Sequence, residues 1–142
     1  MYLSIDFGTR IIGLAVGKII PKGFGVIEND NRAIEKIALI CQKNDIEIVI
    51  VGMPIRSAGE EGTIASKIRE FSQQLADKSD LPIYFEPEQF TSAEAERQIR
   101  ESGEKAEKKK IDELSAILIL EQFIQRSINE ENLTPHILPS KK

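Results

Sequence analysis

A single carboxylate stands near the end of the first strand-like run of the chain, in the sequence LSIDFGTR at residues 3–10. Apolar and polar residues alternate along this run, which is the period of a strand with one buried face, so Asp6 points away from the face of Leu3 and Ile5. A carboxylate in that position is solvated, paired within the protein, or placed to bind a positive group. The chain has one histidine, one cysteine and no tryptophan, so its acids are the main candidates for chemistry.

Two other predicted strands also end in polar or conformationally special residues. The run IEIVIVG leads into Gly52-Met53-Pro54, and the run LPIYFE leads into Glu86-Pro87-Glu88. If these strands lie parallel beside the first one, their carboxyl ends meet at one edge of the sheet. Ligands of open α/β sheets bind at that edge.

The elements that must position these acids follow from periodicity. Short links join the first three strands, which favours an antiparallel meander. Strands are predicted at Tyr2–Phe7, Ile11–Val16, about Gly23–Glu28, Ile46–Gly52 and Leu81–Glu86. Apolar residues recur at helical spacing from Asn31 to Cys41, from Glu60 to Lys78, from Thr91 to Gly103 and from Ile111 to about Ile128. The polar run Glu104–Lys110 between the last two helices is expected to be mobile.

This order predicts an α/β fold with a mixed five-stranded sheet, in which the meander is followed by two parallel strands and helices cover both faces. The right-handed crossover rule places the Ile46 strand beside the first strand and the Leu81 strand outside it. We expect one domain over residues 1–142, with a loose tail after about residue 132.

Composition narrows the class of protein. Apolar residues make up 41% and charged residues 30% of the 142 residues, which is typical of a soluble globular domain. No apolar run approaches the ~20 residues of a membrane helix, and no signal peptide is visible, so we expect a cytoplasmic protein without a membrane partner. The net charge of -4 would repel nucleic acid, so such a partner would need a local basic patch.

Four blocks of the sequence resemble the YqgF/RuvX family, which has the ribonuclease H-like fold. They are IDFGTRIIGLAVG, IVIVGMP, EPEQFTSAEAE and KKKIDELSAILILEQF, and together they extend from about Tyr2 to Phe123. Members of that family are described as Holliday junction resolvases or as nucleases that mature the 5′ end of pre-16S ribosomal RNA. The resemblance therefore implies a metal-dependent endonuclease that hydrolyses phosphodiester bonds.

The resemblance also implies a set of catalytic and metal-binding acids. Asp6 matches the acid of the first strand, Glu88 the glutamate of the third block, and Asp112 the acid that opens the last helix. Carboxylates suit Mg²⁺ or Mn²⁺, and a pair of such ions can activate water and neutralise charge during phosphodiester hydrolysis. Without metal the clustered acids would repel one another. Each acid also has a plainer interpretation: a solvated strand end, an exposed loop acid, or a helix N-cap.

The third block departs from the family pattern. Pro87 stands where the family normally has Asp, and Gln89 where it has Arg. The change leaves open whether Glu86 replaces or assists Glu88 as a metal ligand. It also favours an alternative function, a non-catalytic nucleic-acid-binding or ribosome-assembly factor on a nuclease scaffold.

Several residues are candidates for contact with nucleic acid, either precursor rRNA or branched DNA. Three consecutive lysines next to Asp112 form the best local basic patch, and two arginines on predicted loops are weaker candidates. Small residues after Asp6 would let a phosphate backbone approach the first strand, although they also suit a tight turn. The full set is Lys108, Lys109, Lys110, Arg10, Arg56, Gly8 and Thr9.

Two further expectations concern partners. A junction resolvase would form a homodimer to make paired cuts, but no apolar stripe in the sequence identifies a dimer face. The DFGT turn also resembles the phosphate loop of actin-like and sugar-kinase ATPases. Those proteins enclose their nucleotide between two such domains, which one domain of 142 residues cannot do.

Overall fold

The computed structural model describes residues 1–54, 62–88, 91–103, 107–130 and 133–140. Within them the chain forms the elements that periodicity predicts, in the predicted order. They are β1 (Tyr2–Asp6), β2 (Ile11–Gly17), β3 (Lys22–Glu28), α1 (Ala33–Lys43), β4 (Ile48–Pro54), α2 (Gly62–Ser79), β5 (Ile83–Glu88), α3 (Thr91–Glu101) and α4 (Lys108–Asn129).

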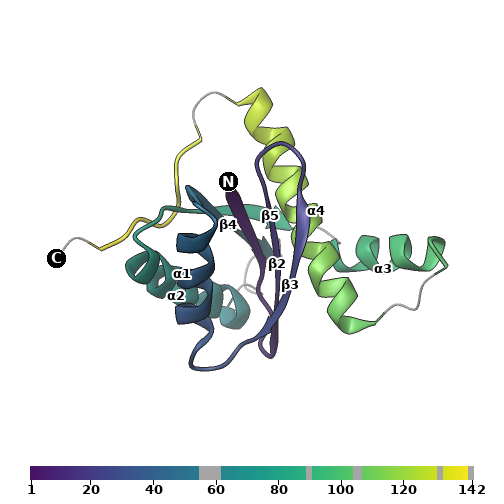
Figure 1. Ribbon diagram of the computed structural model, residues 1–142, viewed down its shortest axis with the longest axis horizontal. Helices are drawn as coiled ribbons and strands as arrows, with labels where there is room; N and C mark the ends of the chain where they lie inside the picture. The colour runs from purple at the N-terminus through teal and green to yellow at the C-terminus, as the bar shows by residue number, and fades with distance from the viewer. Residues whose placement is uncertain (55–61, 89–90, 104–106, 131–132, 141–142) are drawn as a thin grey trace.

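The five strands form one mixed sheet in the order β3-β2-β1-β4-β5, which confirms the predicted topology (Figure 1). β1 pairs antiparallel with β2, and β2 with β3, whereas β4 runs parallel to both β1 and β5. The carboxyl ends of β1, β4 and β5 therefore lie at the same edge of the sheet. Asp6 ends β1 there, and Glu88 ends β5.

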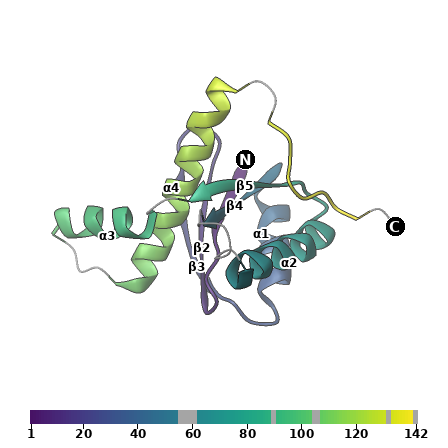
Figure 2. The ribbon, with the colours of Figure 1, turned by 180° about the vertical axis from the view of Figure 1, so that it is seen from behind.

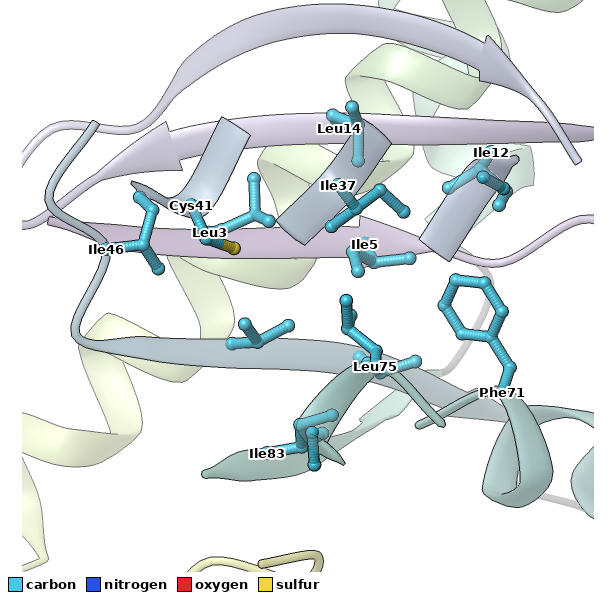
Figure 3. Close-up of a cluster of buried hydrophobic side chains, with 14 of the residues drawn as sticks. Leu3, Ile5, Ile12, Leu14, Ile37, Cys41, Ile46, Phe71, Leu75 and Ile83 are labelled. Atoms are coloured by element: carbon cyan, nitrogen blue, oxygen red, sulfur yellow. The ribbon is translucent and has the colours of Figure 1, made fainter. Parts of the chain in front are cut away.

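Helices α1 and α2 cover one face of the sheet. The larger part of the core lies between this face and the two helices (Figure 3). β-branched and leucine side chains from alternate strand positions meet the apolar faces of the two helices. Burying this apolar surface supplies the main driving force for folding. The largest of these buried side chains include Leu3, Ile5, Ile12, Leu14, Ile37, Leu75 and Ile83.

The opposite face is covered by α4, which crosses the sheet on the side away from α1 and α2 (Figure 2). The hydroxyl of Ser4 donates a 2.7 Å hydrogen bond to the carbonyl of Ala116, so a buried polar side chain of β1 is satisfied by the helix. Gly13 of β2 lies directly under α4: an ideal Cβ on it would overlap the carbonyl oxygen of Asp112. A glycine at this position lets the helix sit close to the sheet.

The last helix begins earlier than the sequence predicted. Lys108, Lys109 and Lys110 form its first turn instead of a mobile run, and Glu107 is its N-cap in extended conformation. Asp112 lies in the second turn and is buried, so it is not the helix cap. α3 projects from the body of the fold and packs on α4 through Ala95 and Ile99 (Figure 1).

The C-terminal segment, which we expected to be loose, follows the outer edge of β5. Ile83 and Ile137 form an antiparallel bridge, and the side chain of Gln73 on α2 donates a 3.0 Å hydrogen bond to the carbonyl of Leu138. The amide of Phe85 donates a 3.1 Å hydrogen bond to Nδ1 of His136, whose ring stacks on the Phe85 ring. Residues 133–140 thereby cover strand-edge groups that would otherwise be open to pairing.

None of the helices described by the structure is long and apolar enough to span a membrane.

The contact between Gly13 and α4 leads to the first prediction. Gly13→Ala should lower the free energy of unfolding by about 1–3 kcal/mol, because the new methyl group forces α4 away from the sheet. Chemical denaturation would measure this loss. Gly103→Ala is the control, because its added methyl group meets open space and it loses stability only through the positive φ of 82° at that residue. A cost for Gly13→Ala no larger than that of the control would contradict the steric argument.

The second prediction concerns the pH dependence of the C-terminal segment. Partial desolvation of the otherwise exposed ring, followed by the charge of Arg126, lowers the pKa of His136 below its usual value near 6.5. The folded state thus favours the neutral ring, whose Nδ1 accepts the Phe85 amide. This stabilisation is complete above pH 6.5 and is lost as the pH falls through the lowered pKa.

We expect hydrogen exchange at the Ile83 and Phe85 amides, after correction for intrinsic rates, to become faster between pH 7 and pH 5. In His136→Ala the same amides should be less protected at pH 7, and their corrected rates should change less with pH. Protection in the wild-type protein that stays constant over this range would show that His136 does not hold the segment.

Candidate functional site

Asp6 lies at the end of β1 on the face that α4 covers, and it is partly buried rather than solvated. Burial, and then the negative charges of Glu88 and Asp112, raise the pKa of Asp6 to about 8, while Lys108 acts in the opposite direction. The carboxyl of Asp6 is thus within electrostatic reach of the other two acids. In the absence of a bound cation it therefore holds its proton to a higher pH than an ordinary aspartate does.

Asp112 reaches the same place from α4, because Gly13 pairs with Asp6 across β1 and β2 and also lies against the Asp112 backbone. Its side chain is only 5% exposed. One oxygen, Oδ1, accepts a 2.6 Å bond from the ammonium of Lys108 one helical turn earlier. The other oxygen, Oδ2, is buried and has no hydrogen-bond partner among the residues that the structure describes.

Glu88 comes from the end of β5, where it pairs in register with Pro54 of β4. Its carboxylate passes over Gly52: an ideal Cβ on Gly52 would lie 3.0 Å from Oε2 of Glu88 and 2.6 Å from Cδ1 of Ile119. A side chain at residue 52 would therefore compete with both Glu88 and α4 for space. Gly52 is a spacer that lets the glutamate lie along the sheet towards α4.

The donor set suits a hard divalent cation. Mg²⁺ and Mn²⁺ prefer carboxylate oxygens, and an unpartnered buried oxygen such as Asp112 Oδ2 is a natural ligand. In the part of the chain that the structure describes, no three acids, histidines or cysteines are placed so that together they could hold a metal ion. Mutual repulsion of the acids and the Lys108–Asp112 pair both oppose such an arrangement before a cation binds.

Glu86, the other glutamate of the third block, has a different partner. It is buried, and its Oε1 accepts hydrogen bonds from Nε and Nη2 of Arg126 at 3.0 and 2.7 Å. Burial raises the pKa of Glu86, and the Arg126 interactions lower it in part. Arg126, near the C-terminal end of α4, thus forms an ion pair with one carboxylate oxygen of Glu86.

Most of the predicted nucleic-acid contacts line one open groove beside the acids. This groove has a volume of about 880 Å³, and its walls include Gly8, Thr9, Arg10, Asn29 and Lys108. Lys109 and Lys110 are exposed next to it on the first turn of α4. Arg56 lies outside the described residues, as does Gln89.

Gly8 has a packing role as well, because an ideal Cβ on it would overlap the carbonyl oxygen of Ile11. The tight β1–β2 turn therefore requires a glycine. The same turn brings Thr9 and Arg10 to the wall of the groove.

Sequence reasoning missed two features of the site. The pairing of Lys108 with Asp112 depends on the early start of α4, although the i, i+4 spacing of the two residues was a signal for it. The close seating of Gly13 against Asp112 joins residues 99 positions apart and left no local signal. Together these two features hold Asp112, the acid of α4, near Asp6.

The fold resembles that of solved RuvC structures. A structure titled "T. thermophilus RuvC in complex with Holliday junction substrate" has a TM-score of 0.56 and 15% sequence identity, and the match covers 88% of this chain and 95% of that one. A second structure of Thermus thermophilus RuvC gives a TM-score of 0.55 at the same identity. At such low sequence identity the similarity shows the fold alone. This structural similarity confirms the predicted ribonuclease H-like architecture.

Closer sequence relatives share nearly the whole chain. A protein of Koribacter versatilis named "Putative pre-16S rRNA nuclease" is 38% identical over 131 residues, which cover 87% of this chain and 86% of the relative. A protein of Sulfurihydrogenibium sp. with the same name is 35% identical over 133 residues, covering 87% of this chain and 89% of that protein. The family model described as "RuvX: Holliday junction resolvase" matches residues 1–126. The chain therefore belongs to the RuvX family.

Proposed function

We propose that this protein is a divalent-metal-dependent endonuclease, with precursor 16S rRNA as its substrate. Its family and its relatives support a nuclease that acts on nucleic acid. The observation that carries the metal-dependent mechanism is the electrostatic coupling of Asp6 to Glu88 and Asp112, together with the buried Oδ2 of Asp112 that has no partner in the described part of the chain. The names of the relatives favour the RNA substrate.

The three acids would hold the metal, and a bound pair of ions supplies an activated water and neutralises charge on the attacking and leaving oxygens. Asp6 is coupled electrostatically to both other acids, so it would hold the metal together with them. It must lose its proton for this role, which couples metal binding to proton release. Pro87 brings no carboxylate, so the ligand set depends on Glu88.

The groove next to the acids is the proposed path of the phosphate backbone. Arg10 and Lys108 would supply its phosphate contacts, while Glu28 and Asp30 on the same walls offset their charge, so the backbone would have to pass on the side of the two cations. Contacts of this kind gain affinity through counterion release and do not read sequence directly. Substrate selection would then depend on the shape of the nucleic acid.

A second candidate substrate is the Holliday junction, which the description of the matched family favours. Both substrates present the same phosphodiester to the same acids. A junction requires two coordinated cuts and hence a second copy of the chain, whereas end maturation of an RNA requires one active site. The oligomeric state during cleavage therefore separates the two candidates.

The proposed function is tested by incubating labelled precursor RNA and four-way DNA junctions side by side with Mg²⁺, with Mn²⁺ and with chelator. We expect metal-dependent cleavage of the RNA. Asp6→Asn should lower it at least about 100-fold, since changing even residues that only orient metal ligands costs 10–100-fold. Glu35→Gln, an exposed acid on α1, is the matched control and should cleave normally.

Cleavage of the junction alone would shift the assignment to the second candidate. Binding of the RNA without cleavage under any metal would instead show a nucleic-acid-binding protein on a nuclease scaffold. Loss of activity in Glu35→Gln equal to that in Asp6→Asn would remove the argument for a specific site.

A further prediction concerns stability without metal. Because the folded state raises the pKa of Asp6 to about 8, folding binds a proton between about pH 4 and pH 8. The free energy of unfolding contributed by this group therefore falls as the pH rises through that range. Asp6→Asn removes the titration and one of the repelling charges.

In chelator at pH 8 we expect Asp6→Asn to melt about 3–6 °C above the wild-type protein, with a smaller difference at pH 5. Thermal unfolding at the two pH values measures the change. A lower melting temperature for the variant at both pH values would mark Asp6 as a structural hydrogen-bonding residue.

A further inference from the structure

Contact with nucleic acid alone does not explain the position of Lys108. Its ammonium lies 2.6 Å from Oδ1 of Asp112, and its charge is also felt by Asp6. The lysine therefore places a positive charge where the three acids repel one another. It does so from the first turn of the helix that carries Asp112.

The two partners of this ion pair differ sharply in their surroundings. The side chain of Asp112 is 5% exposed, whereas that of Lys108 is 75% exposed. The carboxylate is held in place by packing, and the long stem of the lysine lies towards solvent. An ammonium on such a stem can leave and return without disturbing the core.

Leaving Asp112 without any cation would be unfavourable. An ionised carboxylate that is removed from water needs a partner, and one oxygen of Asp112 already has none. Lys108 supplies that partner for the other oxygen. The metal-free site is thus neutralised in part by the protein itself.

The same ammonium is unfavourable once a divalent cation is present. The ion needs the oxygens of Asp112, and two positive charges a few ångströms apart repel each other. Lys108 also lines the groove with Gly8, Thr9 and Arg10, where its ammonium has an alternative position next to a substrate phosphate. The ammonium of Lys108 can therefore lie either beside Asp112 or in the groove.

We propose that Lys108 is an exchangeable internal counterion, which holds Asp112 while the site lacks metal, is displaced by the divalent cation, and then faces the groove. This inference rests on the proposed function for the identity of the competing ion. It makes a distinctive demand, because one residue must stabilise the metal-free protein and weaken metal binding. A lysine with a merely structural role would stabilise the protein and also support metal binding.

The test uses Lys108→Met, which keeps most of the apolar stem and removes the charge. Lys109→Met is the matched control, because it removes the same charge from an exposed neighbour in the same helical turn. Lys108→Arg retains a cation and tests whether charge is the cause. The probe is Mn²⁺, with binding measured by calorimetry at one pH and melting temperatures measured in chelator.

We expect Lys108→Met to melt a few degrees below the wild-type protein in chelator and yet to bind Mn²⁺ about three- to tenfold more tightly. That gain is a fraction of the unscreened Coulomb value, because the lysine side chain is mostly exposed. Lys109→Met should match the wild type in both measurements, and Lys108→Arg should bind Mn²⁺ like the wild type.

Unchanged or weaker Mn²⁺ binding by Lys108→Met would overturn the counterion role while leaving the proposed nuclease intact. The same conclusion holds if Lys109→Met gains affinity equally, since the effect would then be one of net charge. Absence of Mn²⁺ binding in the wild type and in all variants would overturn both this inference and the metal-dependent function. Binding by Lys108→Met alone would support the counterion in its strongest form.

Discussion

The close seating of α4 on the sheet is the contact on which the site depends. Gly13 allows it sterically, and the hydrogen bond from Ser4 to the Ala116 carbonyl fixes the helix one turn beyond Asp112. Because β1 carries both Ser4 and Asp6, the strand that positions the helix also bears the first acid. A shift of α4 would therefore move Asp112 relative to Asp6 before it disturbed the core on the other face.

This seating creates an electrostatic cost that the fold must offset. Packing Asp112 against the sheet removes this side chain from water. Burial of Asp6 raises the pKa of its own carboxyl, and the charges of Glu88 and Asp112 raise it further. Without metal, a proton on Asp6 and the ammonium of Lys108 reduce the repulsion. Stability and function are then opposed at this edge, as is usual where like charges are held together for binding.

Much of the fold could be predicted from the sequence because its signals are local. The alternation in β1, the continuous β-branched run of β4 and the helical stripe of α2 each fix an element, and the crossover rule orders the strands. Asp6 could be placed for the same reason. The start of α4 could not, because Lys108–Lys110 are polar and their helical state depends on the packing of the residues that follow.

The roles of Glu86 and Glu88 show the limit of sequence reasoning most clearly. The two residues share a strand and a face, so periodicity alone cannot assign either to the metal site. The two glutamates are distinguished by Arg126, 40 residues away from Glu86 in the sequence, which binds Glu86 through two of its nitrogens. Arg126 follows Asp112 on α4 by a length of about 21 Å of helix.

One helix thus serves the two glutamates in different ways. Near its N-terminus α4 presents an acid with an unpartnered oxygen, which adds to the repulsion around Asp6 and favours a cation there. Near its C-terminus it presents a guanidinium that neutralises Glu86 within the protein. The charge of Glu88 acts on Asp6 instead, so under the proposed mechanism the charge distribution along α4 would favour Glu88 over Glu86 as the metal ligand.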